Sequence, residues 1–267
     1  MNKIRKTLLV TLVILLTMSA SSFAYEKEAD EVYLNRDLLK KDIWNEYIKL
    51  DEFQKHYAEN PKDAEAMIDS IVDTKMQIHR NNSITPRGGQ GTIAYINFPQ
   101  FKQKNSYYCG PASALTAIYG MGEESSVTGS TYNAKQDTLA YNMGTSSGIG
   151  TYVYRMRNEL NNYSSEQYNY YYAPTKNDMW WIIGGSLLSD NAPILHANTR
   201  EFSYYENYNV EHYLTIVFHN TAIDDDEIGC MAVMDNHYND DYYGTHDISL
   251  DEAYESIRGR YLIGVSL

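Results

Sequence analysis

One cysteine of this chain lies in a local sequence that suits nucleophilic chemistry. Cys109 is followed by Gly110 and Pro111, and then by an apolar run over 114–118 with helical spacing. Because proline is well tolerated in the first turn of a helix, this pattern places Cys109 at a helix N-terminus. The free N–H groups and the helix dipole at such a position favour a thiolate over a thiol. The sequence therefore predicts a nucleophilic sulfur.

A glutamine upstream of the cysteine fits the same chemistry. The amide of Gln103 can donate to an oxyanion together with the backbone N–H of Cys109. A structural role for the cysteine stays open, because a second cysteine, Cys230, lies in an apolar stretch. Cys109 would then be buried on a core helix or joined to Cys230 by a disulfide.

Thiol catalysis also needs an imidazole and a group that orients it, and the C-terminal half offers both. Of the seven histidines, His212 opens an alternating apolar strand over 212–218. An acidic turn at 220–229 separates it from a second strand, 229–235, which ends at Asp235. If these strands pair as a hairpin, Asp235 lies beside His212 and can accept from its ring N–H.

Three neighbouring residues leave alternatives open. Asn236 is a second choice for the orienting group, and His237 is a rival base. Glu211 stands directly before the candidate histidine, where its carboxylate either raises the pKa of the imidazole or faces solvent.

The segment around Cys109 resembles the cysteine motif of the C39-like peptidases, within the papain-like group of thiol enzymes. The resemblance rests on Gln103 and on the residues YCGPAS at 108–113, and it extends over about 95–265. It implies an α+β papain-like fold, in which a helical subdomain bearing the nucleophile packs on an antiparallel sheet. It also implies a Cys-His-Asp arrangement formed by Cys109, His212 and Asp235, with Gln103 in the oxyanion hole.

That resemblance implies a peptidase that hydrolyses peptide bonds of peptide or protein substrates through a thioester. Two departures from the family pattern occur, because Glu211 replaces a glycine and Asn236 replaces a proline. Two alternatives stay open: an inactive C39-like binding module, and another thiol acyl-transfer enzyme such as an amidase, deamidase or transglutaminase.

The N-terminus and the composition bear on location and partners. Basic residues precede an apolar run at 8–18 and small residues up to Ala24, which predicts a secretory signal peptide over 1–24. We expect a secreted protein without a membrane span after cleavage, the alternative being an uncleaved anchor. The net charge of −13 argues against binding to nucleic-acid phosphates. The sequence has no phosphate loop, CxxC pair or HExxH motif, and no cofactor or metal is expected.

Two further segments precede the candidate peptidase domain at 93–267. Residues 25–80 carry apolar stripes broken at Asn60-Pro61, which predicts a helical hairpin with His56 and His79 on its solvated surface. Residues 81–92 are polar, include Gly88-Gly89 and are typical of a linker. Some C39 peptidases cut after a double glycine that follows a helical leader. The resemblance therefore raises a pro-segment hypothesis for 25–89, against a plain connector.

Overall fold

The computed structural model describes residues 35–84, 93–99, 101–206 and 208–266. The predicted signal peptide and the Gly88-Gly89 stretch lie outside these residues. The described helices are α2 (Arg36–Tyr47), α3 (Asp51–Glu59), α4 (Pro61–Ile84), α5 (Cys109–Gly120), α6 (Tyr132–Met143), α7 (Val153–Leu160), α8 (Lys176–Leu188) and α9 (Leu250–Ser256). The described strands are β1 (Ile93–Tyr95), β2 (Tyr168–Tyr172), β3 (Ile194–Asn198), β4 (Glu211–Asn220), β5 (Met231–Asp235), β6 (Gly244–Ile248) and β7 (Tyr261–Val265). Within the described ranges, no helix has the length and apolar character to cross a membrane.

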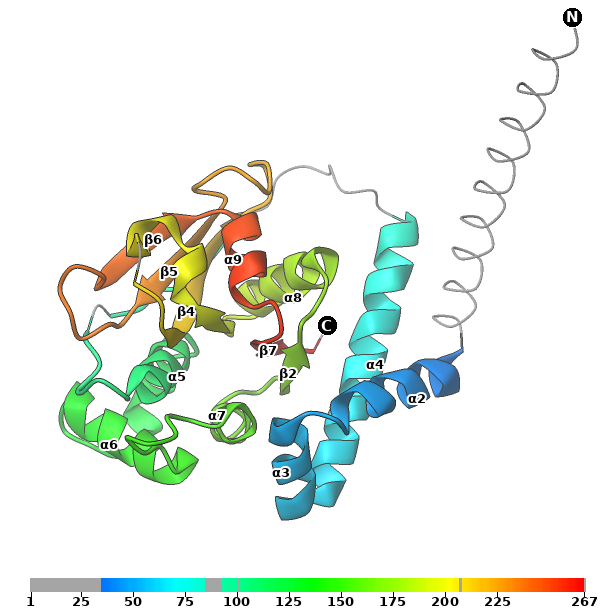
Figure 1. Cartoon of the computed structure of the whole chain (residues 1–267), viewed down its shortest axis with the longest axis horizontal. Coiled ribbons are helices and arrows are strands. Elements are labelled where there is room, and N and C mark those ends of the chain that lie inside the picture. The colour runs from blue at the N-terminus through cyan, green and yellow to red at the C-terminus, as the bar shows by residue number, and fades with distance from the viewer. Residues whose placement is uncertain (1–34, 85–92, 100, 207, 267) are drawn as a thin grey trace, which may run out of the picture.

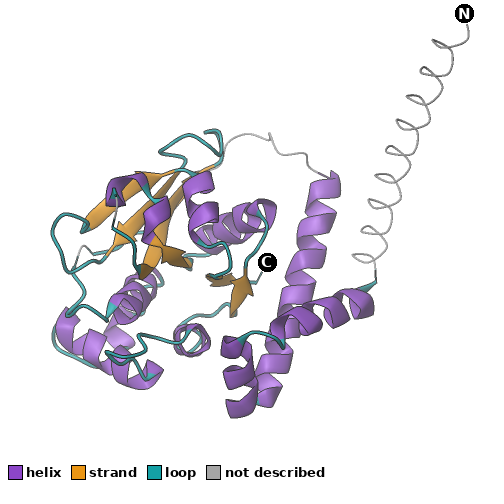
Figure 2. Cartoon of the chain, in the orientation of Figure 1, coloured by secondary structure: helices purple, strands orange, loops and turns teal. Residues whose placement is uncertain are grey.

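The fold is α+β, as predicted, and its strands form one antiparallel sheet. The strand order is β2-β7-β3-β4-β5-β6, and β1 pairs with β4 outside that path. Helix α5 packs on β4, whereas α8 packs on both β4 and β7. Figure 1 shows α5, α6 and α7 gathered on one side of the molecule and α2–α4 on the other, beyond β2. Figure 2 shows the strands lying together with helices around them.

Local sequence signals explain where several elements begin. Thr175 and Asp178 form a capping box at the start of α8, and Ser249 and Glu252 form another at α9. Both boxes follow the sequence pattern of a Ser or Thr with an acidic residue three positions later. Helix α6 begins at Tyr132, because the Thr131 side chain accepts from the backbone N–H of Ala134 and caps the helix.

The N-terminal segment differs from the predicted hairpin because its described residues form three helices. The chain turns at 48–50, and the acidic residues Asp51 and Glu52 then begin α3, where a helix dipole favours negative charge. Helix α4 also extends to Ile84, four residues into the predicted linker. The break after α2 allows Phe53 to pack edge-to-face on Tyr47, with ring centroids 5.8 Å apart.

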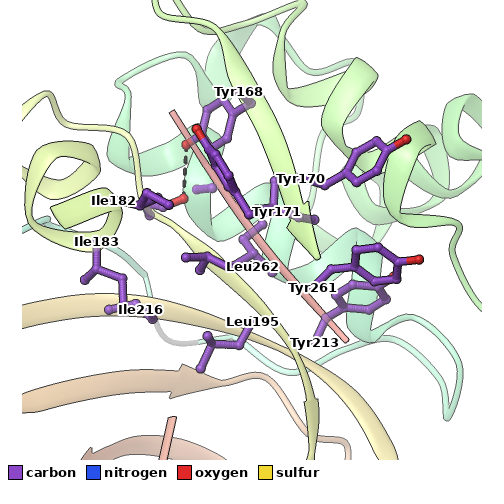
Figure 3. Packing of buried hydrophobic residues seen from close by; sticks show 14 of the residues in the cluster. Tyr168, Tyr170, Tyr171, Ile182, Ile183, Leu195, Tyr213, Ile216, Tyr261 and Leu262 are labelled. Carbon is purple, nitrogen blue, oxygen red and sulfur yellow. Dashed lines mark hydrogen bonds between the residues drawn. The ribbon is translucent and has the colours of Figure 1, made fainter. Parts of the chain in front are cut away.

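Tyrosines form part of the packed interior. Tyr168 and Tyr170 of β2 are fully buried, and Figure 3 shows them among aliphatic side chains such as Leu262. The hydroxyl of Tyr168 donates to the carbonyl of Ala192 at 3.0 Å. A buried phenol needs such a partner, because an unpaired hydroxyl would lose its hydration without compensation.

Candidate active site

Cys109 is the first residue of α5, as its sequence context predicts. Pro111 lies in the first turn, and the preceding residue, Tyr108, makes no side-chain capping bond. The Cys109 side chain is partly exposed. A Cβ atom at Gly110 would stand 2.3 Å from the Oγ1 of Thr151, so only glycine allows this loop to approach the cysteine.

Helix α5 is fastened to β4 by two side-chain hydrogen bonds that fix the cysteine relative to the strand. The Ser113 hydroxyl donates to the Tyr213 carbonyl at 2.9 Å, and the Thr215 hydroxyl donates to the Ser113 carbonyl at 3.2 Å. All three residues are buried. Since His212 directly precedes Tyr213, these bonds bring its ring to the start of α5.

The structure brings Cys109, His212 and Asp235 together. The predicted hairpin is confirmed, because β4 and β5 pair antiparallel. The Nε2 of His212 lies 2.9 Å from Oδ1 of Asp235, and the same ring hydrogen-bonds the Cys109 sulfur. Since Asp235 holds Nε2, the second ring nitrogen, Nδ1, is the one left for the sulfur. Both His212 and Asp235 are almost wholly buried, at 3% and 0% exposure.

The three groups shift one another's pKa toward the charged forms. Burial opposes ionisation of Cys109, yet the hydrogen bond and charge of His212 hold its pKa below the usual value. Burial likewise disfavours the imidazolium of His212, but the charge and hydrogen bond of Asp235 raise its pKa to about 10. Despite its burial, Asp235 has a lowered pKa because of the charge and hydrogen bond of His212. These directions favour a thiolate–imidazolium pair.

Asp235 has further partners that sequence reasoning missed. Its Oδ2 accepts from the hydroxyl of Tyr205 at 2.6 Å and from that of Tyr204 at 3.3 Å. Its Oδ1 also accepts from the backbone N–H of His237 at 2.8 Å. The sequence offered only the Tyr204-Tyr205 pair as a signal. The chain contains 26 tyrosines, and nothing in the sequence distinguishes these two from the rest.

Gln103 lies in a buried position, 4% exposed. Its side-chain Nε2 donates to the Asn105 carbonyl at 2.7 Å, and its Oε1 is buried with no hydrogen-bond partner. The bond to Asn105 uses one of the two amide hydrogens, which leaves the second for an oxyanion.

Asn236, the second choice as orienting group, has its side chain engaged elsewhere. Its Nδ2 donates to the Phe101 carbonyl at 2.7 Å, and its Oδ1 accepts from the Thr116 hydroxyl at 3.4 Å. Its backbone carbonyl accepts from the Gln103 N–H at 2.6 Å. Asn236 thus fastens the Gln103 segment to the end of β5, next to Asp235.

The remaining polar candidates also have defined places. His237 is buried, and its Nδ1 accepts from the Asn239 N–H at 3.0 Å. Its ring meets the His212 ring edge-on, with the ring centroids 5.4 Å apart. His237 therefore lies beside the site, and among the described residues no hydrogen bond joins it to the Cys109 sulfur. Glu211 does not join the site, because it pairs with Arg260 at 3.1 Å and lies 3.7 Å from His196.

Cys230 lies apart from this chemistry. Both cysteines are free, so the Cys109–Cys230 disulfide does not occur. The sulfur of Cys230 is buried and accepts from the Leu250 N–H at 3.1 Å, and burial raises the pKa of this thiol to about 11. Cys230 is therefore a core thiol, as its apolar surroundings in the sequence suggested.

A cavity of about 230 Å³ lies elsewhere, lined by residues of α4, α8, β1 and β4 that include Trp180, Trp181 and His219. None of the three site residues lines it. Over the described ranges, no group of three or more His, Cys, Asp or Glu side chains is placed to hold a metal ion.

An antiparallel sheet facing a cysteine at a helix N-terminus is the arrangement of the papain-like thiol enzymes. The sequence comparison gives the family within this class. Residues 95–262, more than half of the chain, match the Peptidase_C39 like family, and the chain belongs to that family. No curated protein matches the chain. The family is one of cysteine peptidases and related thiol enzymes, which agrees with the resemblance seen around Cys109.

Proposed function

We propose that this protein is a secreted cysteine peptidase that hydrolyses peptide bonds through a thioester intermediate. The observation that carries the proposal is the double engagement of His212, which hydrogen-bonds Asp235 on one side and Cys109 on the other. A buried histidine held between a carboxylate and a thiol is the geometry of an activated nucleophile. The family supports the reaction class, and the N-terminal apolar run supports secretion.

In the first half of the reaction, the Cys109 thiolate attacks the carbonyl carbon of the scissile bond. The oxyanion that forms accepts from the Cys109 backbone N–H and from the free amide hydrogen of Gln103. His212, as imidazolium, gives its proton to the departing amine, the C–N bond breaks, and a thioester remains. Asp235 stabilises the imidazolium and holds the ring in the required tautomer.

In the second half, the neutral His212 takes a proton from water, and the resulting hydroxide attacks the thioester carbonyl. The C–S bond then breaks, the carboxylic acid leaves, and the thiolate–imidazolium pair returns. In a transamidating enzyme, an amine instead of water would attack the same thioester and take the acyl group. The acceptor therefore decides whether the reaction is hydrolysis or transfer.

The test uses secreted full-length protein and a peptide library of mixed sequence in water enriched in oxygen-18. Hydrolysis places the heavy isotope in each new carboxyl terminus, whereas transfer to an added amine yields an unlabelled amide. We expect labelled carboxyl termini with the wild type and with Cys230→Ser, but none with Cys109→Ala. Absence of new termini from the wild type, under conditions where iodoacetamide labels Cys109, would support the binding-module alternative.

A further inference from the structure

Tyrosine hydroxyls from a short helical turn hold the second oxygen of the Asp235 carboxylate. Turn η3 (Ser203–Tyr205) places the Tyr205 hydroxyl 2.6 Å and the Tyr204 hydroxyl 3.3 Å from Oδ2. The carboxylate is completely buried, so water does not replace these donors. Both oxygens of the carboxylate are therefore fixed, and rotation about its Cβ–Cγ bond would break bonds on both sides.

The Tyr205 ring is itself held rigidly. It stacks on Tyr242, with ring centroids 4.4 Å apart and an interplanar angle of 12°. The Tyr242 ring in turn stacks on Tyr208. The edge of the His237 ring meets it at 6.2 Å. The next residue, Glu206, has a φ of 47°, which is costly for a non-glycine residue and turns the chain directly after Tyr205.

We propose that Tyr205 is a positioning residue, which fixes the Asp235 carboxylate and through it the His212 ring, with Tyr204 as its weaker companion. The proposal deepens the proposed function, since it concerns the same site. A phenol that donates to a carboxylate forms a short, charge-assisted hydrogen bond, stronger than one between neutral groups. The 2.6 Å distance to Tyr205 fits such a bond, and the longer distance to Tyr204 marks a weaker one.

The hydroxyl of Tyr205 also favours the charged form of Asp235. Burial opposes that charge, whereas the bonds from His212 and Tyr205 lower the pKa of the carboxyl. Without the hydroxyl, Asp235 takes up a proton at a higher pH. The imidazolium then loses its counter-charge, so the Cys109 thiolate forms at a higher pH as well. The titratable groups that face Asp235 or its tyrosines include Cys109, Tyr204, Tyr205, Tyr208, His212, His237, Tyr242, His246 and Glu252.

The test is the pH dependence of Cys109 alkylation by iodoacetamide, read by peptide mapping on the full chain. We expect Tyr205→Phe to move the acid limb of the rate profile to higher pH by about half a unit or more. Tyr208→Phe is the matched control, because it removes a hydroxyl from the same ring stack that does not touch Asp235. Its profile should overlay that of the wild type.

Two outcomes overturn the proposal: a Tyr205→Phe profile that overlays the wild type, or an equal shift with Tyr208→Phe. If Tyr205→Phe does not fold, the test uses Tyr204→Phe instead. We expect this variant to show a smaller shift in the same direction, and the absence of a shift would overturn the proposal. Because alkylation needs no substrate, the result is distinct from the peptide-library test. An inactive protein can still show the shift, and an active one can lack it.

A second inference rests on a different region, the contact between the N-terminal helices and the edge of the sheet. Strand β2 is an edge strand, and the hydroxyl of Tyr47 on α2 takes the place of a neighbouring strand. It accepts from the Tyr172 N–H at 2.9 Å and donates to the Tyr170 carbonyl at 3.1 Å. Backbone groups at a buried strand edge need such partners.

Charged groups reinforce this contact. Arg157 of α7 is only 2% exposed, and its guanidinium binds Asp63 of α4 while donating to the Tyr168 carbonyl at 2.8 Å. Glu59 of α3 accepts from Arg155 at 2.6 Å and from the Tyr154 hydroxyl at 2.7 Å. Removal of the helices would take the carboxylate of Asp63 away from Arg157 and expose the apolar surface that the helices cover, and both changes are unfavourable.

We infer that residues 36–84 stay bound to the peptidase domain as a permanent part of it, even where the chain is cut between Pro86 and Thr92. This inference opposes release as a pro-segment. The test inserts the recognition sequence of a specific protease there, and gel filtration follows cleavage of the secreted full chain. We expect the two pieces to elute together with unchanged Cys109 alkylation; separation of the pieces would overturn the inference.

If the inserted sequence resists the protease, native-state hydrogen exchange of the intact chain gives the answer. We expect amides of α4 and of β2 to open together over the same denaturant range, because one interface holds both. Opening of α4 at lower denaturant, while β2 stays protected, would overturn the inference.

Discussion

The described part of the molecule contains two histidine–aspartate pairs in which the imidazole is buried, with similar geometry and different surroundings. His212 binds Asp235 through Nε2 at 2.9 Å, and His56 binds Asp63 through Nε2 at 2.7 Å. The His56 ring is 0% exposed, which corrects the prediction of a solvated surface role. The pairs differ at the other ring nitrogen, which faces the Cys109 sulfur in the first pair and the Tyr170 hydroxyl in the second.

The two carboxylates also differ in what balances their charge. Asp63 has a guanidinium partner, Arg157, and its side chain is 30% exposed. Asp235 is 0% exposed and has no guanidinium or ammonium among its described partners; hydroxyls, a backbone N–H and the His212 ring hold it. The positive charge that satisfies Asp235 is therefore the imidazolium itself. In this chain, the carboxylate without another cation among its described partners belongs to the pair beside the thiol.

Asp235→Asn should give the largest effect, a loss of about 100-fold or more in the rate of Cys109 alkylation or peptide hydrolysis at neutral pH. All the described partners of this carboxylate donate to it, so an amide NH₂ group would meet donors. The negative charge that stabilises the imidazolium is also lost. Rates within threefold of the wild type, in a variant with a native circular dichroism spectrum, would refute the role of Asp235.

Asp63→Asn tests the other pair, and here stability rather than reactivity should change. The substitution leaves the buried Arg157 without a formal negative partner, and we expect a loss of about 2–3 kcal/mol in the free energy of unfolding. The partial exposure of Asp63 keeps this below the cost of a fully buried pair. Urea unfolding gives the free energy, and alkylation of Cys109 serves as the control. A large loss of reactivity in the folded variant would mean that the pairs are coupled.

The contrast also shows what the sequence could predict. His212 stands at the start of an apolar strand, and a short turn brings a second strand, which ends in Asp235, back beside it. That pairing follows from local pattern. The partners of His56 are Asp63 of α4, Tyr154 of α7 and Tyr170 of β2, and no local pattern relates these segments.

The same limit explains why the hydrogen bonds from Tyr204 and Tyr205 to Asp235 were not predicted. Tyr205 lies in an irregular segment between β3 and β4, and its φ-strained neighbour, Glu206, has no sequence signature. The α+β class, the capping boxes and the position of Cys109 follow from short-range rules, so they were predictable. Strand β6, rich in polar residues over 244–248, has a weak apolar alternation and escaped prediction.

The pH dependence separates the two pairs by sign. The pKa of Cys109 is lowered and that of His212 is raised to about 10, so hydrolysis should rise below the ordinary thiol pKa of ~8.5 and fall near pH 10. Asp63 has a lowered pKa, since its bond to His56 and the charge of Arg157 outweigh its burial. Its stabilisation is present above the unfolded pKa of ~3.9 and is lost as the pH falls through the lower folded value.

We therefore expect the stability of the wild type to fall as the pH drops below the unfolded Asp pKa of ~3.9, and Asp63→Asn to flatten this acid limb of stability. Thermal unfolding between pH 3 and pH 7 measures this limb. If the stability of the wild type and of Asp63→Asn falls equally steeply with decreasing pH, other carboxyl groups cause the acid sensitivity.

Tyr170→Phe should have the smallest effect. It removes the hydroxyl that occupies, beside His56, the position that the Cys109 sulfur occupies beside His212. The Tyr170 hydroxyl lies 3.2 Å from Nδ1 of His56, so its loss leaves one buried ring nitrogen unpaired. We expect a loss of about 1 kcal/mol in the free energy of unfolding, with no change in Cys109 alkylation. Cys109→Ala is the counterpart, since it should abolish hydrolysis at a similarly small cost in stability. A Tyr170→Phe variant that loses reactivity while keeping its stability would reverse the assignment, because it would give the His56 pair the chemical role.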